Sequence, residues 1–298
     1  MAIGNISFVP ASEMGTGTFK KEKDLRNLVH YSKQCGIHLY DTSDDYGTEK
    51  GLGSELRKEY SSRDEYQIVT KFTKPEKAYK LISLLQESIE KIFDSKDEQV
   101  DLLLMHWPYP FLYKKIWAEM IKAKELGLTK HIGVCNFGIR ELQELKKSFG
   151  VMPEVNQIEL HPLFSQEKLC KFCIDNNIRI MSYSPFGRGN DVLLNNGKIK
   201  EIANRNKKTV QQIILRWNIQ NSYIPIPASS SAKHIAENAE AMKFVLSIED
   251  MTELNALNSG MRTRLDAKTF FSLKQKIKFG LVRSLWPALM IRDSIKNR

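Results

Sequence analysis

Four polar side chains near the ends of short apolar segments could together carry out acid–base chemistry. The set comprises Asp41 after IHLY, Tyr46 in the loop that follows, Lys71 in YQIVTKF and His106 after VDLLLM. Tyrosine is a weak acid with a pKa of about 10, and a nearby ammonium stabilises its phenolate and lowers that pKa. We expect Lys71 to supply this ammonium and Asp41 to keep it charged, while a neutral His106 donates one N–H to a carbonyl oxygen.

These side chains could supply every group that carbonyl reduction requires except the hydride donor. They would polarise the carbonyl, donate a proton and stabilise a developing alkoxide. No side chain offers hydride, so a cofactor must supply it. Each residue alone also has an ordinary structural explanation: Asp41 can cap a loop, Lys71 can reach water, and Tyr46 and His106 can pack. Their convergence on neighbouring strand ends favours a shared site.

The elements that must position them alternate between two periodicities. Short, nearly continuous apolar runs are typical of parallel strands buried on both faces, and segments of helical period separate them. Gly36, Gly127 and Gly150 stand where helices should end. The pattern predicts right-handed βαβ units with strands near 15–19, 37–42, 66–72, 100–107, 131–137, 153–160, 178–185 and 223–228.

We expect the sheet to close into a single (β/α)8 TIM barrel. The chain of 298 residues suits one barrel over about 12–245, after a small N-terminal hairpin and before an extra helix and C-terminal tail at 246–298. An open doubly wound sheet should show G-x-G-x-x-G after its first strand, whereas GTGTFKK at 15–21 lacks the third glycine. Barrel active sites form at the carboxyl ends of the strands, which would bring the four side chains to one mouth.

The order of these segments resembles that of the aldo-keto reductases over residues 12 to about 240. The matching segments are GTGTF (15–19), DTSDDYG (41–47) with Glu49 and Gly53, VTK (69–71), MHWP (105–108), GVCNF (133–137), NQIELHP (156–162), YSPFG (183–187) and IPIPASSSAKHIAEN (224–238). The resemblance implies an NAD(P)H-dependent reductase that transfers hydride to an aldehyde or ketone. It also implies Tyr46 as proton donor, Lys71 and Asp41 as its tuning pair, and His106 as the residue that orients the carbonyl.

The resemblance further implies a cofactor site and a substrate pocket. Asn136 and Gln157 would hold the nicotinamide carboxamide, and Tyr183 would stack on the ring. The full implied cofactor set is Gly17, Thr18, Asp41, Cys135, Asn136, Gln157, Tyr183, Ser184, Pro185, Phe186, Gly187, Ser229, Lys233, His234, Glu237 and Asn238. The implied substrate pocket is formed by Phe19, Tyr46, His106 and Trp107, with no metal.

The chain departs from the family pattern around the adenosine phosphate. Many relatives have lysine and arginine where this chain has Ala228 and His234, and those cations bind the 2′-phosphate of NADP. With only one weak cationic partner, a 2′-phosphate gains little binding free energy over a 2′-hydroxyl. Lys233 and Ser229 remain nearby. We therefore expect NADP(H) as cofactor with NAD(H) also usable. Cys135 replaces a frequent serine and should weaken one hydrogen bond to the carboxamide.

Two cysteines, Cys170 and Cys173, form a C-x-x-C. A redox pair or half a zinc site is one interpretation, but KLCKFCIDNN reads as an amphipathic helix, so we favour two small apolar residues one turn apart. The four cysteines of the chain are too few for a disulfide framework.

The formal net charge of +10 is enriched in the tail but forms no dense run, so we expect no nucleic-acid partner. No signal peptide and no apolar run of ~20 residues is evident, which makes the cytoplasm the expected location. Residues 261–298 mix aromatic and basic residues. They could contact a membrane surface, but Pro287 interrupts any long helix, so we favour a segment packed over the barrel mouth.

Two other functions remain open. The chain could be a cofactor-binding regulatory subunit of a membrane protein, or a metal-dependent hydrolase using His106, His161 and Asp41. We favour a reductase of a small-molecule carbonyl substrate, acting as a monomer or small homo-oligomer. Which aldehyde, ketone, sugar or steroid it reduces is open.

Overall fold

Eight short parallel strands form the centre of the molecule. The computed structural model describes residues 8–18, 22–264, 270–271 and 275–285. Each strand pairs in parallel with the next along the chain. The strands are β1 (Thr16–Gly17), β2 (Leu39–Asp41), β3 (Gln67–Phe72), β4 (Val100–Met105), β5 (Thr129–Cys135), β6 (Val155–Glu159), β7 (Arg179–Tyr183) and β8 (Ile224–Pro225). All eight expected strands are present, and the predicted barrel is confirmed.

The first and last strands close the barrel through main-chain hydrogen bonds. The amide of Gly15 donates to the carbonyl of Pro225 at 3.0 Å, and the amide of Gly17 donates to the carbonyl of Pro227 at 3.2 Å. The Thr16 hydroxyl donates to the same Pro227 carbonyl at 3.1 Å. The neighbouring prolines lack an N–H, so these contacts run in one direction, from the β1 segment to the β8 segment.

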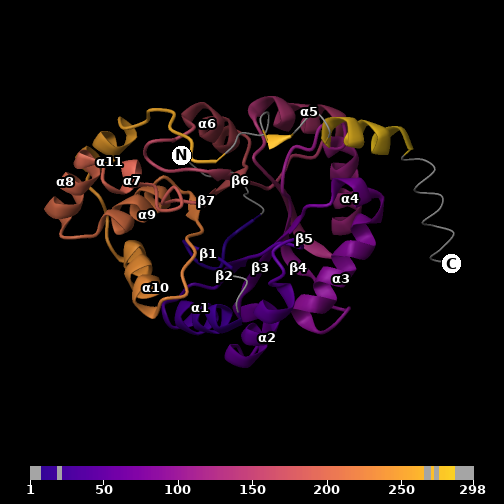
Figure 1. The fold of residues 1–298 in the computed structure, drawn as a ribbon, viewed down its shortest axis with the longest axis horizontal. Coiled ribbons are helices and arrows are strands. Elements are labelled where there is room, and N and C mark those ends of the chain that lie inside the picture. Colours follow the sequence, from indigo (N-terminus) through magenta and orange to yellow (C-terminus); the bar gives the residue numbers. More distant parts are fainter. Residues whose placement is uncertain (1–7, 19–21, 265–269, 272–274, 286–298) are drawn as a thin grey trace.

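Helices surround the strands on the outside (Figure 1). Their inward faces are apolar and cover the outer surface of the sheet. The α-helices are α1 (Glu22–Gln34), α2 (Glu49–Glu59), α3 (Leu81–Phe93), α4 (Tyr113–Glu125), α5 (Ile139–Phe149), α6 (Glu167–Asp175), α7 (Asp191–Leu194), α8 (Gly197–Asn206), α9 (Val210–Gln220), α10 (Ala232–Ala239) and α11 (Ile248–Asn255). Short 3-10 turns are η1 (Arg63–Glu65), η2 (Pro75–Lys80) and η3 (Glu240–Lys243).

A separate apolar cluster fills the barrel itself. It consists of side chains from successive strands, as expected where alternate residues of each strand point inward. Its strand members include Leu39, Val69, Leu102, Leu104, Cys135, Val155, Met181 and Ile224. Phe8 is fully buried in the same cluster, and Gln67 at the start of β3 donates to the carbonyl of Val9 at 3.0 Å. The segment after residue 8 therefore seals the amino end of the barrel.

The expected N-terminal hairpin is not seen in residues 8–15, which contain no strand. The remainder of that prediction, residues 1–7, lies outside the described residues. The extra helix predicted at the start of residues 246–298 is present as α11.

The described part of the tail packs on the barrel. Met261 donates its amide to the carbonyl of Leu163 at 3.0 Å, and residues 275–285 are helical. This helix lies beside α4 and α5 (Figure 1). Phe279 on it contacts the ring of Tyr109, with ring centres 6.0 Å apart. No helix among the described residues is long and apolar enough to cross a membrane.

The C-x-x-C cysteines lie on α6, as the amphipathic pattern indicates. Cys170 and Cys173 are both buried and unbonded to each other. In the part of the chain that the structure describes, no group of three or more His, Cys, Asp or Glu side chains could hold a metal ion. The two cysteines are therefore packing residues of a helix. The described residues also offer no ligand set for the metal-dependent hydrolase alternative.

Candidate active site

A cavity of about 520 Å³ opens at the carboxyl ends of the strands. Its walls come from residues at or just beyond the ends of seven strands and from the C-terminal segment. They include Gly17, Thr18, Asp41, Tyr46, His106, Trp107, Asn136, Gln157, Tyr183, Ser184, Pro185 and Phe186, all of them predicted from the sequence. Because parallel strands all end at this face, residues far apart in the chain meet here.

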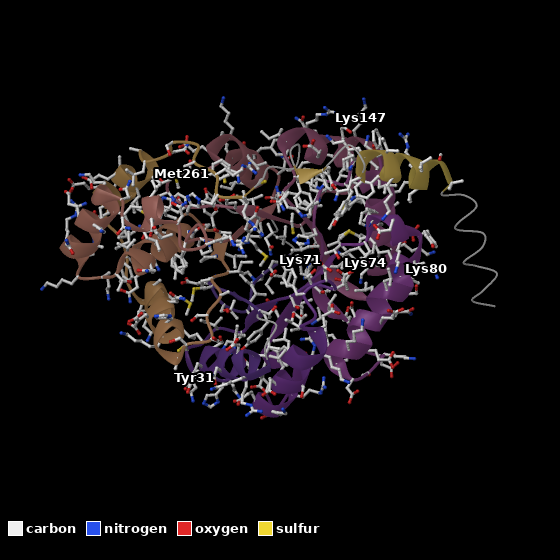
Figure 2. All side chains as sticks on the ribbon, in the orientation of Figure 1. Tyr31, Lys71, Lys74, Lys80, Lys147 and Met261 are labelled. Carbon is white, nitrogen blue, oxygen red and sulfur yellow. The ribbon has the colours of Figure 1, made fainter. Side chains whose placement is uncertain are left out.

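A fully buried ion pair lies at the floor of this cavity. The Lys71 ammonium donates to the Asp41 carboxylate and, at 2.8 Å, to the carbonyl of Thr42. Gln157 donates from Nε2 to the other Asp41 oxygen at 2.8 Å. Figure 2 shows Lys71 inside the ring of helices, whereas Lys147 lies at its outer edge. Both carboxylate oxygens are thus satisfied, as a buried charge requires.

The Tyr46 ring lies close to this pair. The Lys71 nitrogen is 5.0 Å from the centre of the ring. The Lys71 charge is the largest influence on the Tyr46 pKa and lowers it, but burial and the Asp41 carboxylate together outweigh it and leave that pKa above its ordinary value. For Lys71, burial alone would lower the pKa, and the Asp41 charge raises it overall, so the ammonium persists.

His106 also lies close to Tyr46. The two ring centres are 6.1 Å apart, with the planes at 74°. Burial, followed by the charges of Lys71 and Arg264, lowers the pKa of His106 to about 3. The imidazole is therefore neutral at physiological pH, as the sequence analysis expects, and can donate one N–H without carrying charge.

Asn136 links His106 to the far wall of the cavity. Its Nδ2 donates to the His106 carbonyl at 3.2 Å, and its Oδ1 accepts a hydrogen bond from the Tyr183 hydroxyl at 2.7 Å. Asn136 has a φ of 62°, in the left-handed region that asparagine tolerates better than most residues. The turn after β5 thereby directs the amide into the mouth rather than along the strand.

Several predicted cofactor residues lie outside the cavity walls. Cys135 is buried in the barrel interior, where burial raises the pKa of its thiol. Ser229 and Asn238 line a small hollow beside β1. Lys233 and Glu237 form an ion pair at 3.8 Å along α10, where Ser231 accepts from the His234 amide. Gly187 lies in the loop after β7, at a φ of 54°. Phe19 lies outside the described residues.

The sequence analysis missed five wall residues: Arg188, Gly189, Ile226, Pro227 and Arg264. Arg188 and Gly189 directly follow YSPFG, so a loop reaching two residues further would have included them. Ile226 and Pro227 directly precede Ala228 in a segment already singled out. Arg264 lies in the unmatched tail, where no local pattern points to a site.

The donor and acceptor set suits a nicotinamide dinucleotide. Amide groups of Asn136 and Gln157 can pair with a carboxamide, and the Tyr183 ring borders the same cavity. A Cβ added to Gly17 would lie 3.4 Å from the Cβ of Ala228, so the backbones of the two segments approach closely there. The Ser231-capped end of α10 offers main-chain amides of the kind that receive anions.

Comparisons with known proteins agree with this geometry. A model of the Aldo/keto reductase family matches residues 11–259. The chain is 34% identical over 263 residues to the 9,11-endoperoxide prostaglandin H2 reductase of Trypanosoma cruzi, covering 87% of this chain and 92% of that protein. It is 34% identical over 261 residues to the methylglyoxal reductase DkgA of Salmonella typhimurium, covering 87% and 94%.

A solved structure supports the fold. The aldo-keto reductase of Bombyx mori, crystallised in complex with NADP, superimposes with a TM-score of 0.80 at 27% identity, over 90% of this chain and 95% of that one.

Proposed function

This chain belongs to the aldo/keto reductase family, and from that premise we propose that it reduces a small aldehyde or ketone with Tyr46 as the proton donor. It is an NAD(P)H-dependent oxidoreductase that acts on carbonyl compounds, as its family and its reductase relatives are. Because the Salmonella relative is named for methylglyoxal, we include small dicarbonyl compounds among the substrates. The observation that carries the proposal is the buried Lys71–Asp41 pair beneath Tyr46, facing a neutral His106 in one cavity.

We propose that the cofactor binds across this mouth. A nicotinamide dinucleotide, when bound, supplies hydride to the carbonyl carbon. Asn136 and Gln157 would hold its carboxamide and Tyr183 would pack on its ring. The loop of Ser184, Pro185, Phe186 and Gly187 would hold the pyrophosphate, with Gly17, Thr18, Ser229, Lys233, His234, Glu237 and Asn238 around the remainder.

In this proposal the protein holds the carbonyl oxygen and moves one proton. The neutral His106 ring and the Tyr46 hydroxyl both donate hydrogen bonds to that oxygen, and the Tyr46 proton passes to it as negative charge develops. The phenolate left behind is stabilised by the Lys71 ammonium, whose own charge is held by Asp41. Asp41 is itself held in position by Gln157.

Replacement of Tyr46 by phenylalanine tests the proposal. Tyr46→Phe keeps the ring and removes the acidic proton, so we expect kcat to fall by a factor of ~10² or more. The Kd for NADPH, measured by fluorescence titration, should stay near that of the wild type. Tyr109→Phe is the matched control, because Tyr109 is another buried tyrosine near the mouth that does not line the cavity. Undiminished kcat in Tyr46→Phe would contradict the role of this residue.

We further propose that both NADPH and NADH serve as cofactors. Ala228 cannot contribute charge to a 2′-phosphate, and the Lys233 ammonium faces Glu237. Ser229 and His234 remain as polar groups, which can serve a hydroxyl as well as a phosphate. The ratio of kcat/KM for the two cofactors measures the preference, and a preference for NADPH above ~10³-fold would refute dual use.

A further inference from the structure

The described residues of the cavity wall carry an excess of positive charge. Its charged wall residues are Asp41, Arg188 and Arg264. The Asp41 carboxylate is already neutralised by Lys71. Within the part of the chain that the structure describes, neither guanidinium has an acidic partner. Among the described residues, therefore, the charges of Arg188 and Arg264 at the cavity wall have no acidic counterpart.

Arg264 is held at the rim by a buried carboxylate. Glu159 ends β6 and is only 1% exposed. It accepts hydrogen bonds from the Thr263 amide at 2.7 Å, from the Thr263 hydroxyl, and from the Arg264 amide at 3.1 Å. This clamp fixes the backbone of the C-terminal segment on the barrel. Arg264 is exposed and lines the cavity.

The two arginines come from different segments of the cavity wall. Arg188 follows Ser184–Gly187, the loop that the proposed function assigns to the pyrophosphate. Arg264 lines the same cavity as Tyr46 and His106. Its charge also contributes, after burial and Lys71, to the lowered pKa of His106. Coulombic influence between exposed charges is largely screened beyond about 8–10 Å at physiological ionic strength. His106 itself is neutral and does not compete with Arg264 for an anion.

We propose that Arg264 binds a carboxylate on the substrate, so that the preferred substrates are aldehydes or ketones bearing that group. This inference rests on the proposed carbonyl reduction and names its substrate class. A guanidinium pairs with a carboxylate through two parallel N–H···O hydrogen bonds, which also orients the bound molecule. Trp107 lines the same cavity and offers an apolar surface for the body of the substrate.

The test compares two aldehydes of nearly equal shape. In 4-carboxybenzaldehyde the para group is a planar anion, and in 4-nitrobenzaldehyde it is a planar neutral group. The two aldehydes differ in intrinsic reactivity, but this difference cancels when the ratio of their kcat/KM values is compared between wild type and variant. We expect Arg264→Met to lower the ratio of carboxy to nitro substrate by about tenfold, the size of one lost charged hydrogen bond. Arg264→Lys, which restores a cation without the planar fork, should recover part of the ratio.

Arg262→Met is the matched control. Arg262 lies two residues away in the same segment, but lines a separate cavity of about 240 Å³, with its guanidinium 4.6 Å from the centre of the Phe164 ring. Its replacement should leave the ratio within about twofold of the wild type. A second readout does not depend on turnover: benzoate should bind the enzyme–NADPH complex more weakly in Arg264→Met, while the Kd for NADPH itself is unchanged.

The outcomes separate this inference from the function on which it rests. Arg264→Met could reduce both aldehydes with an unchanged ratio of kcat/KM and bind benzoate with unchanged affinity. That outcome would overturn the role of Arg264 and leave the proposed carbonyl reduction intact. An equal loss of ratio in Arg262→Met would also overturn it, because general surface charge would then explain the preference. If wild type reduces neither aldehyde with either cofactor, the proposed function fails and this inference with it.

Discussion

Tyr46 experiences opposing influences on its pKa. The sequence suggests that the Lys71 ammonium lowers the pKa of this phenol. In the structure that charge is the largest single influence, yet burial and the Asp41 carboxylate raise the pKa overall. Burial disfavours the phenolate, and the Lys71 ammonium is paired with Asp41, so the phenol faces an ion pair and not a free cation. A phenol that keeps its proton at neutral pH is a suitable donor for reduction.

This arrangement predicts the pH dependence of reduction. Tyr46 must be protonated, so activity is present below its pKa and is lost as pH rises through it. Since that pKa lies above the ordinary value of about 10, kcat/KM should stay flat between about pH 6 and pH 9 and fall only in more alkaline solution. His106, with a pKa of about 3, should add no inflection in that range. A pH profile with NADPH checks this, and a break near the ordinary histidine pKa would contradict it.

The residues of the candidate active site differ in how readily the sequence alone predicts them. Lys71 stands out as a charged residue within the buried strand β3, and His106 as a polar residue directly after the buried strand β4. Arg264 has no such signal, since only the long-range clamp by Glu159 brings it to the mouth. Asn136 could be found by type, but the left-handed turn that directs it inward could not.

At the scale of elements, α2 and α3 approach so closely that their contact requires a glycine. A Cβ added to Gly53 on α2 would lie 1.7 Å from the carbonyl oxygen of Ile92 on α3. The same helix carries Glu49, which accepts hydrogen bonds from Thr70 at 2.9 Å and Ser88 at 3.1 Å. Thr70 directly precedes Lys71, so the position of α2 bears on the strand that carries the catalytic ammonium.

We therefore predict that Gly53→Ala destabilises the protein. The clash is with backbone and cannot be relieved by a rotamer change, so a loss of about 1–3 kcal/mol or more in the free energy of unfolding is expected. Urea denaturation followed by circular dichroism measures it. Gly197→Ala is the control, because a Cβ at that helical position meets nothing within 4 Å and should be neutral or slightly stabilising. Equal stability of the two variants would contradict the close packing of α2 on α3.

At the scale of the whole molecule, the alternation of strand and helix was enough to predict the barrel. Eight apolar runs in one chain leave few other ways to bury strands on both faces. The strand boundaries are harder to predict from the sequence. β1 and β8 each have only two residues, because hydrogen bonds to Pro225 and Pro227 close the barrel there without a regular ladder. The tail could not be predicted in detail, because its packing depends on a surface that the folded barrel creates.

That surface is an aromatic cluster at the mouth. Phe271 is 4% exposed, and its ring contacts those of Trp107, Tyr109 and Phe279. Phe270 stacks on Trp107, with ring centres 4.1 Å apart and planes at 10°. Aromatic contacts of this kind add to the free energy gained by apolar burial. The cluster thus attaches the helix at 275–285 to the barrel by its apolar face.

Removal of the central ring should therefore release this helix locally without unfolding the barrel. Phe271→Ala is expected to cost about 3 kcal/mol at the contact, which corresponds to ~10²-fold faster amide hydrogen exchange in residues 275–285. Exchange in the barrel strands should be unaffected, because their protection depends on the interior and outer cores. Leu281→Ala, at a side chain that is 60% exposed on the same helix, should leave exchange near the wild-type rate. If Phe271→Ala instead accelerated exchange equally in the strands and the tail, the tail would be part of the cooperative core rather than a separately attached cover of the mouth.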